Sequence, residues 1–110
     1  MRTQEMRAET RIPVSQRGTL TAGDAWYPCL VQDMTTKGFF IVSSREHAVG
    51  QALGFRCAFS PEKLLECKVE VRHVNDTGMG AKIVEIDEKG ANLCQLYLQE
   101  QYADKLNRSG

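Results

Sequence analysis

The sequence predicts a mainly-β domain, either a small antiparallel sandwich or a barrel, followed by one helix. Two observations support this prediction. From Val14 onward, short apolar runs alternate with clusters of turn residues, which is the spacing of antiparallel strands. After Asp87 the apolar residues instead recur at helical intervals, as far as about Leu106. A length of 110 residues suits a single domain.

The first residues differ in character from the rest. Residues 1–10 are polar and charged, and after the initiator only Met6 and Ala8 are apolar, which is too little apolar surface to anchor a packed element. We therefore divide the chain into a flexible N-terminal arm, residues 1–12, and a folded domain, residues 13–110.

Strands are expected wherever an apolar run lies between turn residues. The first four are predicted at residues 14–21, 26–34, 39–43 and 53–59. The strand from Leu65 to Arg72 is the most regular, because apolar and charged residues alternate with the period of two that places one face in a core. Asn-Asp-Thr-Gly at 75–78 predicts a hairpin turn, after which residues 79–86 return alongside.

The helix is predicted from about Ala91 to Leu106, with Asp87 as its N-cap. Its apolar positions recur at helical intervals, namely Cys94, Tyr97, Leu98, Tyr102 and Leu106. We expect this amphipathic helix to cover an open end or face of the β-structure.

Charge and cysteine content exclude several kinds of protein. Fourteen basic side chains balance fourteen acidic ones. Proteins that bind DNA or RNA nonspecifically usually carry an excess of basic residues, so we expect no binding to DNA or RNA.

The four cysteines lack metal-ligand spacing, so we expect buried reduced thiols and no metal site; they are Cys29, Cys57, Cys67 and Cys94. No apolar run approaches the roughly 20 residues of a membrane span. We expect a cytoplasmic protein without a signal peptide or membrane insertion.

Several residues invite functional interpretations that their surroundings do not support. His47 and His73 have no catalytic constellation near them in the pattern, so each is predicted to be a surface or strand residue, and no enzyme activity is expected. Aromatic residues could form a stacking platform for RNA, but on alternating strands they are predicted to lie mainly in the core; they are Trp26, Tyr27, Phe39, Phe40, Phe55 and Phe59.

An R-x-x-x-R motif precedes the first strand. Arg7 and Arg11 supply planar cationic groups of the kind that bind a guanine or a phosphate, and Ile-Pro-Val follows them at 12–14. Alone, the pair is more readily explained as part of a solvated arm in which Glu5 and Glu9 are charge partners.

A D-x-T-x-x-G motif lies between two apolar runs. Asp33, Thr35 and Gly38 place a carboxylate, a hydroxyl and a glycine at the mouth of two predicted strands, where they can be aimed at one small polar ligand. Alone, the motif is more readily explained as a β-turn whose Asp and Thr satisfy backbone N–H groups and whose Gly supplies an unusual dihedral. The coincidence of both motifs with the strand pattern favours a ligand site.

With these motifs in this order, nearly the whole chain resembles the PilZ family of cyclic di-GMP receptors. Residues 69–72 and 78–81 look like the family's penultimate hairpin, and the final helix also has its counterpart. The resemblance implies a six- to seven-stranded antiparallel β-barrel with a C-terminal α-helix. It also implies a bacterial second-messenger receptor, without a further cofactor, that signals to a downstream protein by conformational change.

The resemblance implies roles for the site residues. Arg7 and Arg11 would stack on guanine and bind phosphate or the Hoogsteen edge. Asp33 would accept hydrogen bonds from guanine N1–H and N2–H₂. Thr35, where the family most often has Ser, would offer its hydroxyl and backbone, and Gly38 would let the chain turn closely. Secondary candidates are Met6, Lys37 and Arg72.

Two further expectations follow from the resemblance. Met6 stands where some family members have another Arg that holds a second, intercalated ligand, so we expect one cyclic di-GMP per chain. Because the arm has no apolar anchor yet carries half the site, we also expect residues 1–11 to be disordered without ligand and to close across the barrel mouth when it binds. The alternative is a PilZ-like adapter that does not bind nucleotide, although such adapters typically lose one of the two motifs and this chain keeps both.

Overall fold

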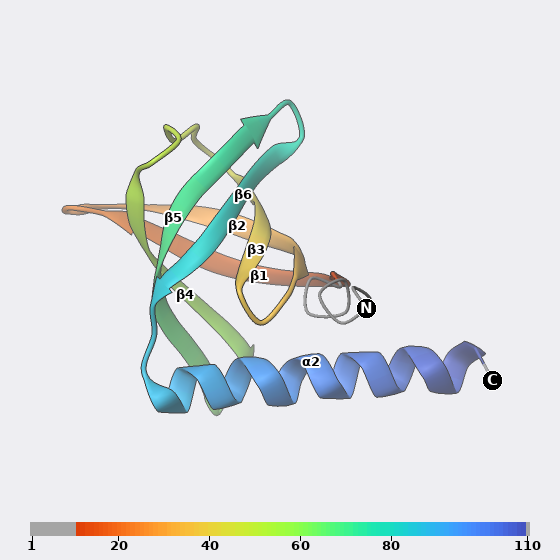
Figure 1. Ribbon diagram of the computed structural model, residues 1–110. Helices are drawn as coiled ribbons and strands as arrows, with labels where there is room; N and C mark the ends of the chain where they lie inside the picture. Colours follow the sequence, from red (N-terminus) through yellow and green to blue (C-terminus); the bar gives the residue numbers. More distant parts are fainter. Residues whose placement is uncertain (1–10, 110) are drawn as a thin grey trace, which may run out of the picture.

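A computed structural model describes residues 11–109 and shows six strands followed by one helix (Figure 1). The strands are β1 (Ile12–Ala22), β2 (Ala25–Met34), β3 (Gly38–Ser43), β4 (Ala52–Ser60), β5 (Lys63–Asn75) and β6 (Gly78–Glu85), and the helix is α2 (Glu88–Ser109). Most of the predicted arm lies outside the described residues, so the division of the chain at residue 12 stays a prediction.

The strands form a closed antiparallel barrel in the order β1-β2-β3-β6-β5-β4. Four hairpin connections join neighbours in the sequence, and two long-range pairings, β3 with β6 and β1 with β4, complete the closure. The prediction of a small barrel with a C-terminal helix is therefore confirmed. Closure removes the free edges that an open sheet of this size would expose.

The barrel core follows the predicted alternation. On β5, Leu65, Val69 and Val71 are fully buried, while the charged residues between them are not. Phe39 and Phe55 are also buried, with ring centroids 4.6 Å apart. Burying a side chain of this kind stabilises the fold by about 1.5–3 kcal/mol.

Strands extend one to three residues beyond most predicted ends, because their ladders continue to the turns. Ile12 pairs with Met34 and is buried, so β1 begins two residues before Val14. At the β5–β6 hairpin the Asn75 carboxamide oxygen accepts hydrogen bonds from the backbone N–H groups of Thr77 and Gly78, at 2.8 and 3.1 Å. The predicted hairpin turn is confirmed.

Two residues predicted to be apolar contacts are exposed. Trp26 is 66% exposed because it lies beside the tip of the β1–β2 hairpin, which projects from the barrel (Figure 1). Tyr102 is 53% exposed, and the C-terminal part of α2 extends beyond the strands that the structure describes (Figure 1). Both predictions were wrong for the same reason: the β1–β2 hairpin and α2 each extend beyond the body of the barrel.

His47 was predicted to be a surface or strand residue and is neither. It is buried in the β3–β4 loop, with its ring edge-on to Tyr27 at a centroid distance of 5.3 Å. Burial and the charge of Arg45 lower the pKa of His47. Ser43 Oγ lies 3.5 Å from Nε2 of His47, and the same hydroxyl oxygen accepts a hydrogen bond from the Arg45 backbone N–H, so it stabilises the loop.

The cysteines are free, as expected, and most are buried. Burial raises the pKa of Cys57 to about 12 and that of Cys94 to about 11, so both thiols stay protonated near neutral pH. Among the described residues, no helix is long and apolar enough to cross a membrane.

The helix begins at its predicted cap. Asp87 Oδ1 accepts a hydrogen bond from the Gly90 backbone N–H at 2.7 Å, and this bond fixes the first turn as helical from Glu88. The start is therefore three residues earlier than predicted.

Helix α2 covers the place where β1 and β4 separate. β1 and β4 pair only from Gly18 to Thr21 on the β1 side, so the two strands separate beyond this segment. There the Tyr97 ring stacks on Phe59 at 4.1 Å, and its hydroxyl oxygen accepts a hydrogen bond from Gln16 Nε2 at 2.8 Å. Tyr97 therefore anchors the helix to both strands.

We predict that Tyr97→Phe lowers the free energy of unfolding by about 1 kcal/mol, because it removes the Gln16 hydrogen bond and keeps the stacking. Urea denaturation measures the change. Tyr102→Phe is the matched control on the exposed part of α2 and should change stability by less than about 0.5 kcal/mol. Equal losses in the two variants would contradict the role of Tyr97 as an anchor.

Candidate functional site

A pocket of about 330 Å³ lies where the β2–β3 loop approaches β5 and β6. Its lining comes from the residue before β1, the end of β2, the loop, the start of β3, and the facing parts of β5 and β6. The lining residues are Arg11, Asp33, Thr35, Lys37, Gly38, Phe39, Arg72, His73, Gly80, Ala81 and Lys82.

Most residues singled out in the two motifs meet at this pocket. The predicted site residues that line it are Arg11, Asp33, Thr35, Gly38, Lys37 and Arg72. Arg7 and Met6 lie outside the described residues. Residues 11 and 33 are 22 positions apart in the sequence, and the antiparallel pairing of β1 with β2 brings them together.

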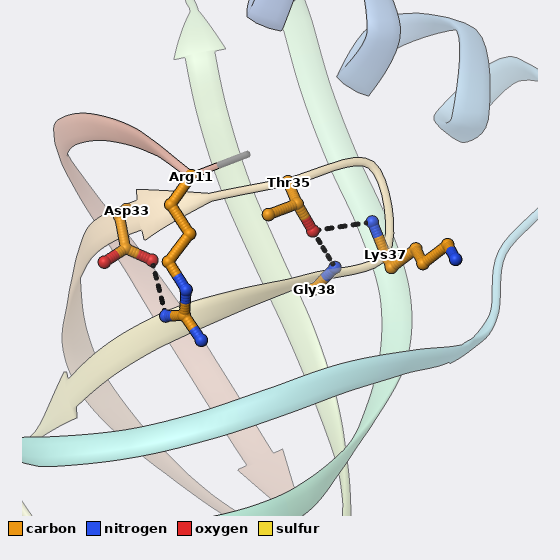
Figure 2. A network of polar contacts seen from close by, with 5 residues as sticks. All are labelled: Arg11, Asp33, Thr35, Lys37 and Gly38. Carbon is orange, nitrogen blue, oxygen red and sulfur yellow. Dashed lines mark hydrogen bonds and ion pairs between the residues drawn. The ribbon is translucent and has the colours of Figure 1, made fainter. Parts of the chain in front are cut away.

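Arg11 and Asp33 form an ion pair at the pocket (Figure 2). Arg11 Nη1 donates a hydrogen bond to Asp33 Oδ1 at 3.3 Å, and the side chains are 55% and 26% exposed. Exposed ion pairs of this kind contribute about 0–1 kcal/mol. The ion pair can therefore break, and each of the two side chains can bind a ligand instead, at little cost to the stability of the fold.

A β-bulge keeps the Asp33 carboxylate out of the core. The register of β2 against β3 shifts between Val31 and Asp33. In a regular strand these two residues would point to the same face, and the carboxylate would be buried with Val31. With the extra residue, Val31 and Met34 are both buried, and Asp33 borders the pocket instead.

Thr35 organises the loop. Its hydroxyl oxygen accepts hydrogen bonds from the backbone N–H groups of Lys37 and Gly38, at 2.9 and 3.2 Å (Figure 2). The Thr35 N–H also donates to the Gly38 carbonyl at 2.9 Å. The hydroxyl oxygen thus stabilises the turn, while the hydroxyl hydrogen can still be donated to a ligand. The β-turn interpretation of the motif is correct for Thr35 but not for Asp33, whose carboxylate contacts Arg11.

Gly38 is needed for space and not for its dihedral angles. It is not among the glycines with positive φ. A Cβ at this position would lie 3.1 Å from Lys82 Cα and closer still to the Ala81 carbonyl oxygen. The Lys37 carbonyl accepts a hydrogen bond from the Ile83 N–H at 2.8 Å. The loop is therefore held tightly against β6.

The wall formed by β5 and β6 contains residues that the sequence did not single out as ligands. His73, Gly80, Ala81 and Lys82 line the pocket, and His73, although it is a strand residue as predicted, also belongs to the site. One signal could have identified it. Continuing the alternation of β5 past Val71 places a polar His73 on the inward face, which is unusual unless the strand is irregular there.

The pocket is locally basic in a chain with no net charge. Four cationic side chains line it against one carboxylate, that of Asp33. Arg72 Nε also lies 3.7 Å from Glu70 Oε2, in an exposed pair. The cationic residues are Arg11, Lys37, Arg72 and Lys82. Such a site favours an anionic ligand of limited size.

Comparison with known proteins agrees with the fold. A model of the PilZ domain family matches residues 5–100. Among solved structures, the chain is similar to the Bacillus subtilis inhibitor of motility MotI/DgrA, with a TM-score of 0.70 and 17% sequence identity over 88% of this chain and 49% of that chain. The chain thus spans about half the length of that structure, and the likeness concerns the fold. No curated protein matches the chain.

We predict that Gly38→Ala lowers the free energy of unfolding by about 1–3 kcal/mol, because the added methyl group would clash with the backbone of β6 at Ala81 and Lys82. Thermal or urea denaturation measures the loss. Thr36→Ala, at an exposed position in the same loop, is the control and should be close to neutral. A Gly38→Ala variant as stable as the parent would show that the loop and β6 are less tightly packed than described.

Proposed function

The chain belongs to the PilZ domain family, and we propose that it is a receptor for cyclic di-GMP that binds at the pocket between the β2–β3 loop and β6. Proteins with this domain are cyclic di-GMP receptors or adapters and not enzymes. The observation that supports the proposal best is the meeting of Arg11 with Asp33, Thr35 and Gly38 at one basic pocket.

The ligand chemistry fits the residues of the pocket. Cyclic di-GMP presents two phosphate anions and two guanines, so it requires cations, planar groups and an acceptor for the guanine N1–H and N2–H₂ groups. Arg11 and Arg72 offer guanidiniums to the phosphates and to a guanine face or Hoogsteen edge. Asp33 is the acceptor. Its carboxylate binds the edge of a guanine, so its negative charge does not need to face a phosphate.

Binding involves an exchange of partners at the ion pair. Without ligand, Arg11 and Asp33 are paired at 3.3 Å. A guanine edge replaces Arg11 as the partner of Asp33, and a phosphate replaces Asp33 as the partner of Arg11. Because the original pair is exposed, the exchange costs little, and several charge-assisted hydrogen bonds to the ligand replace a single one of 3.3 Å.

The signal is a change in the surface that the protein presents to a partner. In this proposal the N-terminal arm, which carries Arg7, closes across the pocket when the nucleotide binds. A downstream protein then recognises the closed form, and the receptor acts in the cytoplasm, where it is exposed to a soluble nucleotide. Residues 1–10 of the arm lie outside the described residues.

We predict binding at micromolar affinity or tighter, equivalent to about 8 kcal/mol or more. Arg7→Ala, Arg11→Ala and Asp33→Ala should each weaken binding by at least about 2 kcal/mol, or roughly 30-fold, because each leaves a polar ligand group without its partner. Titration calorimetry measures the affinities. Melting temperatures without ligand should barely move for Arg11→Ala and Asp33→Ala, since the ion pair is exposed.

Arg17→Ala is the matched control, because Arg17 is an exposed arginine of β1 that does not line the pocket. It should bind cyclic di-GMP like the parent. If the parent gives neither heat nor a thermal shift at about 100 μM ligand, the chain is the adapter and not the receptor. If Arg11→Ala binds like the parent, the arginine motif has been assigned incorrectly.

We further predict one cyclic di-GMP per chain, and a ratio approaching two for Met6→Arg. A thioether offers neither the plane nor the charge that a second, intercalated nucleotide needs beside four phosphates. An added guanidinium supplies both. The calorimetric ratio tests this directly, and a ratio of two in the parent would show that another cation, such as Arg2 or Arg72, holds the second molecule.

A further inference from the structure

A β-turn in the β3–β4 loop lies against β5. The Gln51 N–H donates a hydrogen bond to the Ala48 carbonyl at 3.0 Å, and Gly50 has a φ of 93°, as a type II turn with glycine at its third position requires. The Ala48 N–H also donates to Gln51 Oε1 at 3.2 Å, and the buried His47 precedes the turn. The turn is therefore held by its own hydrogen bonds and anchored to the barrel through His47.

This turn binds both backbone groups of Val71. The Gly50 N–H donates to the Val71 carbonyl at 2.7 Å, and the Val71 N–H donates to the Gln51 carbonyl at 2.9 Å. Two residues thus face one residue of β5, which is the arrangement of a G1 β-bulge with glycine at positive φ. The pairing of β4 with β5 ends at Ala52 and Glu70. Within residues 11–109, the two bonds to Val71 are therefore the last main-chain bonds on this side of β5.

Arg72 follows directly and is the extra residue of another β-bulge, between β5 and β6. Val71 lies opposite Ala81 and His73 lies opposite Gly80, so the register leaves Arg72 without a paired residue on β6. Val71 is fully buried, whereas Arg72 is exposed and lines the pocket. The side chain of such an extra residue takes its direction from the backbone on either side of it. On the N-terminal side, that backbone is Val71, which the turn holds.

We propose that Gly50 is a positioning residue for the nucleotide pocket: it holds Val71 and thereby fixes the direction in which Arg72 presents its guanidinium to the ligand. This inference rests on the proposed function of the pocket. Gly50 is not among the residues that line the pocket, and the turn acts as the same rigid support in the free and the bound protein. A guanidinium that is already in place loses less conformational freedom on binding, so the turn raises the affinity without touching the ligand.

Position 50 requires glycine for its backbone angle and not for space. A Cβ at this position would have no atom within 4 Å other than those of its chain neighbours, so only the φ of 93° disfavours another residue. Gly23, in the β1–β2 hairpin, is a matched case. It has a φ of 60°, equally open surroundings and no place in the pocket lining. Alanine imposes the same kind of backbone strain at both positions, and only at position 50 does this strain reach Arg72.

Titration calorimetry with cyclic di-GMP on Gly50→Ala and Gly23→Ala tests the proposal. Both variants should melt about 4–8 °C below the parent, because alanine is strained at positive φ. Gly50→Ala should weaken binding roughly three- to tenfold, the range of coupling between neighbouring groups. Gly23→Ala should bind like the parent. Gly50→Asn should lie between the parent and Gly50→Ala, because asparagine tolerates this turn position, and it takes over the test if Gly50→Ala does not fold.

A double-mutant cycle shows whether Gly50 acts through Arg72. Arg72→Ala should weaken binding roughly tenfold or more, because it removes a charged partner of the ligand. In the Arg72→Ala background, Gly50→Ala should cause no further loss, since no guanidinium is left to position. A further loss of the same size in that background would overturn the route through Arg72.

The outcomes separate this inference from the receptor proposal. A parent that does not bind cyclic di-GMP overturns both. A parent that binds, with Gly50→Ala binding equally well, overturns only the positioning role of Gly50. Equal losses of affinity for Gly50→Ala and Gly23→Ala would show that lower stability, and not the placement of Arg72, weakens binding, and would also overturn that role.

Discussion

The close contact of Gly38 with β6 is the constraint on which both the barrel and the pocket depend. The pairing of β3 with β6 is one of the two long-range pairings that connect the β1–β3 half of the sheet with the β4–β6 half. Because Gly38 has no side chain, β3 can begin directly against Ala81 and Lys82. The same contact holds the Thr35–Gly38 turn in place, so the residues that close the barrel also position the loop of the proposed ligand site.

The regular parts of the strands build the core, and the irregular parts build the site. Period-two alternation buries Leu65, Val69 and Val71, but it would also bury Asp33 and His73 if it continued without interruption. A bulge beside each of these two residues moves its side chain to the pocket. Each of these two polar groups thus lies at the pocket beside a defined break in the ladder.

The sequence predicts much of this fold, because burial and turn chemistry are local signals. Alternation and the Asn75 turn locate the strands, and the motifs locate the β2–β3 loop. What the sequence does not predict depends on geometry between distant segments. Trp26 and Tyr102 are exposed because their elements extend past the barrel, and His73 joins the site only through the register of β5 on β6. The motif predicts that Gly38 lets the chain turn closely, but it does not predict that β6 is the element that Gly38 approaches.

The most direct test of the account is a backbone amide NMR titration with cyclic di-GMP, with GTP and cyclic GMP as controls. The account predicts that cyclic di-GMP alone causes saturable shifts, centred on residues 33–38, on Arg72 and His73, and on residues 80–82. Amides around His47, which belong to a separate pocket, should stay unchanged. An absence of shifts at saturating ligand, or shifts centred on His47, would contradict the assignment of this pocket as the nucleotide site.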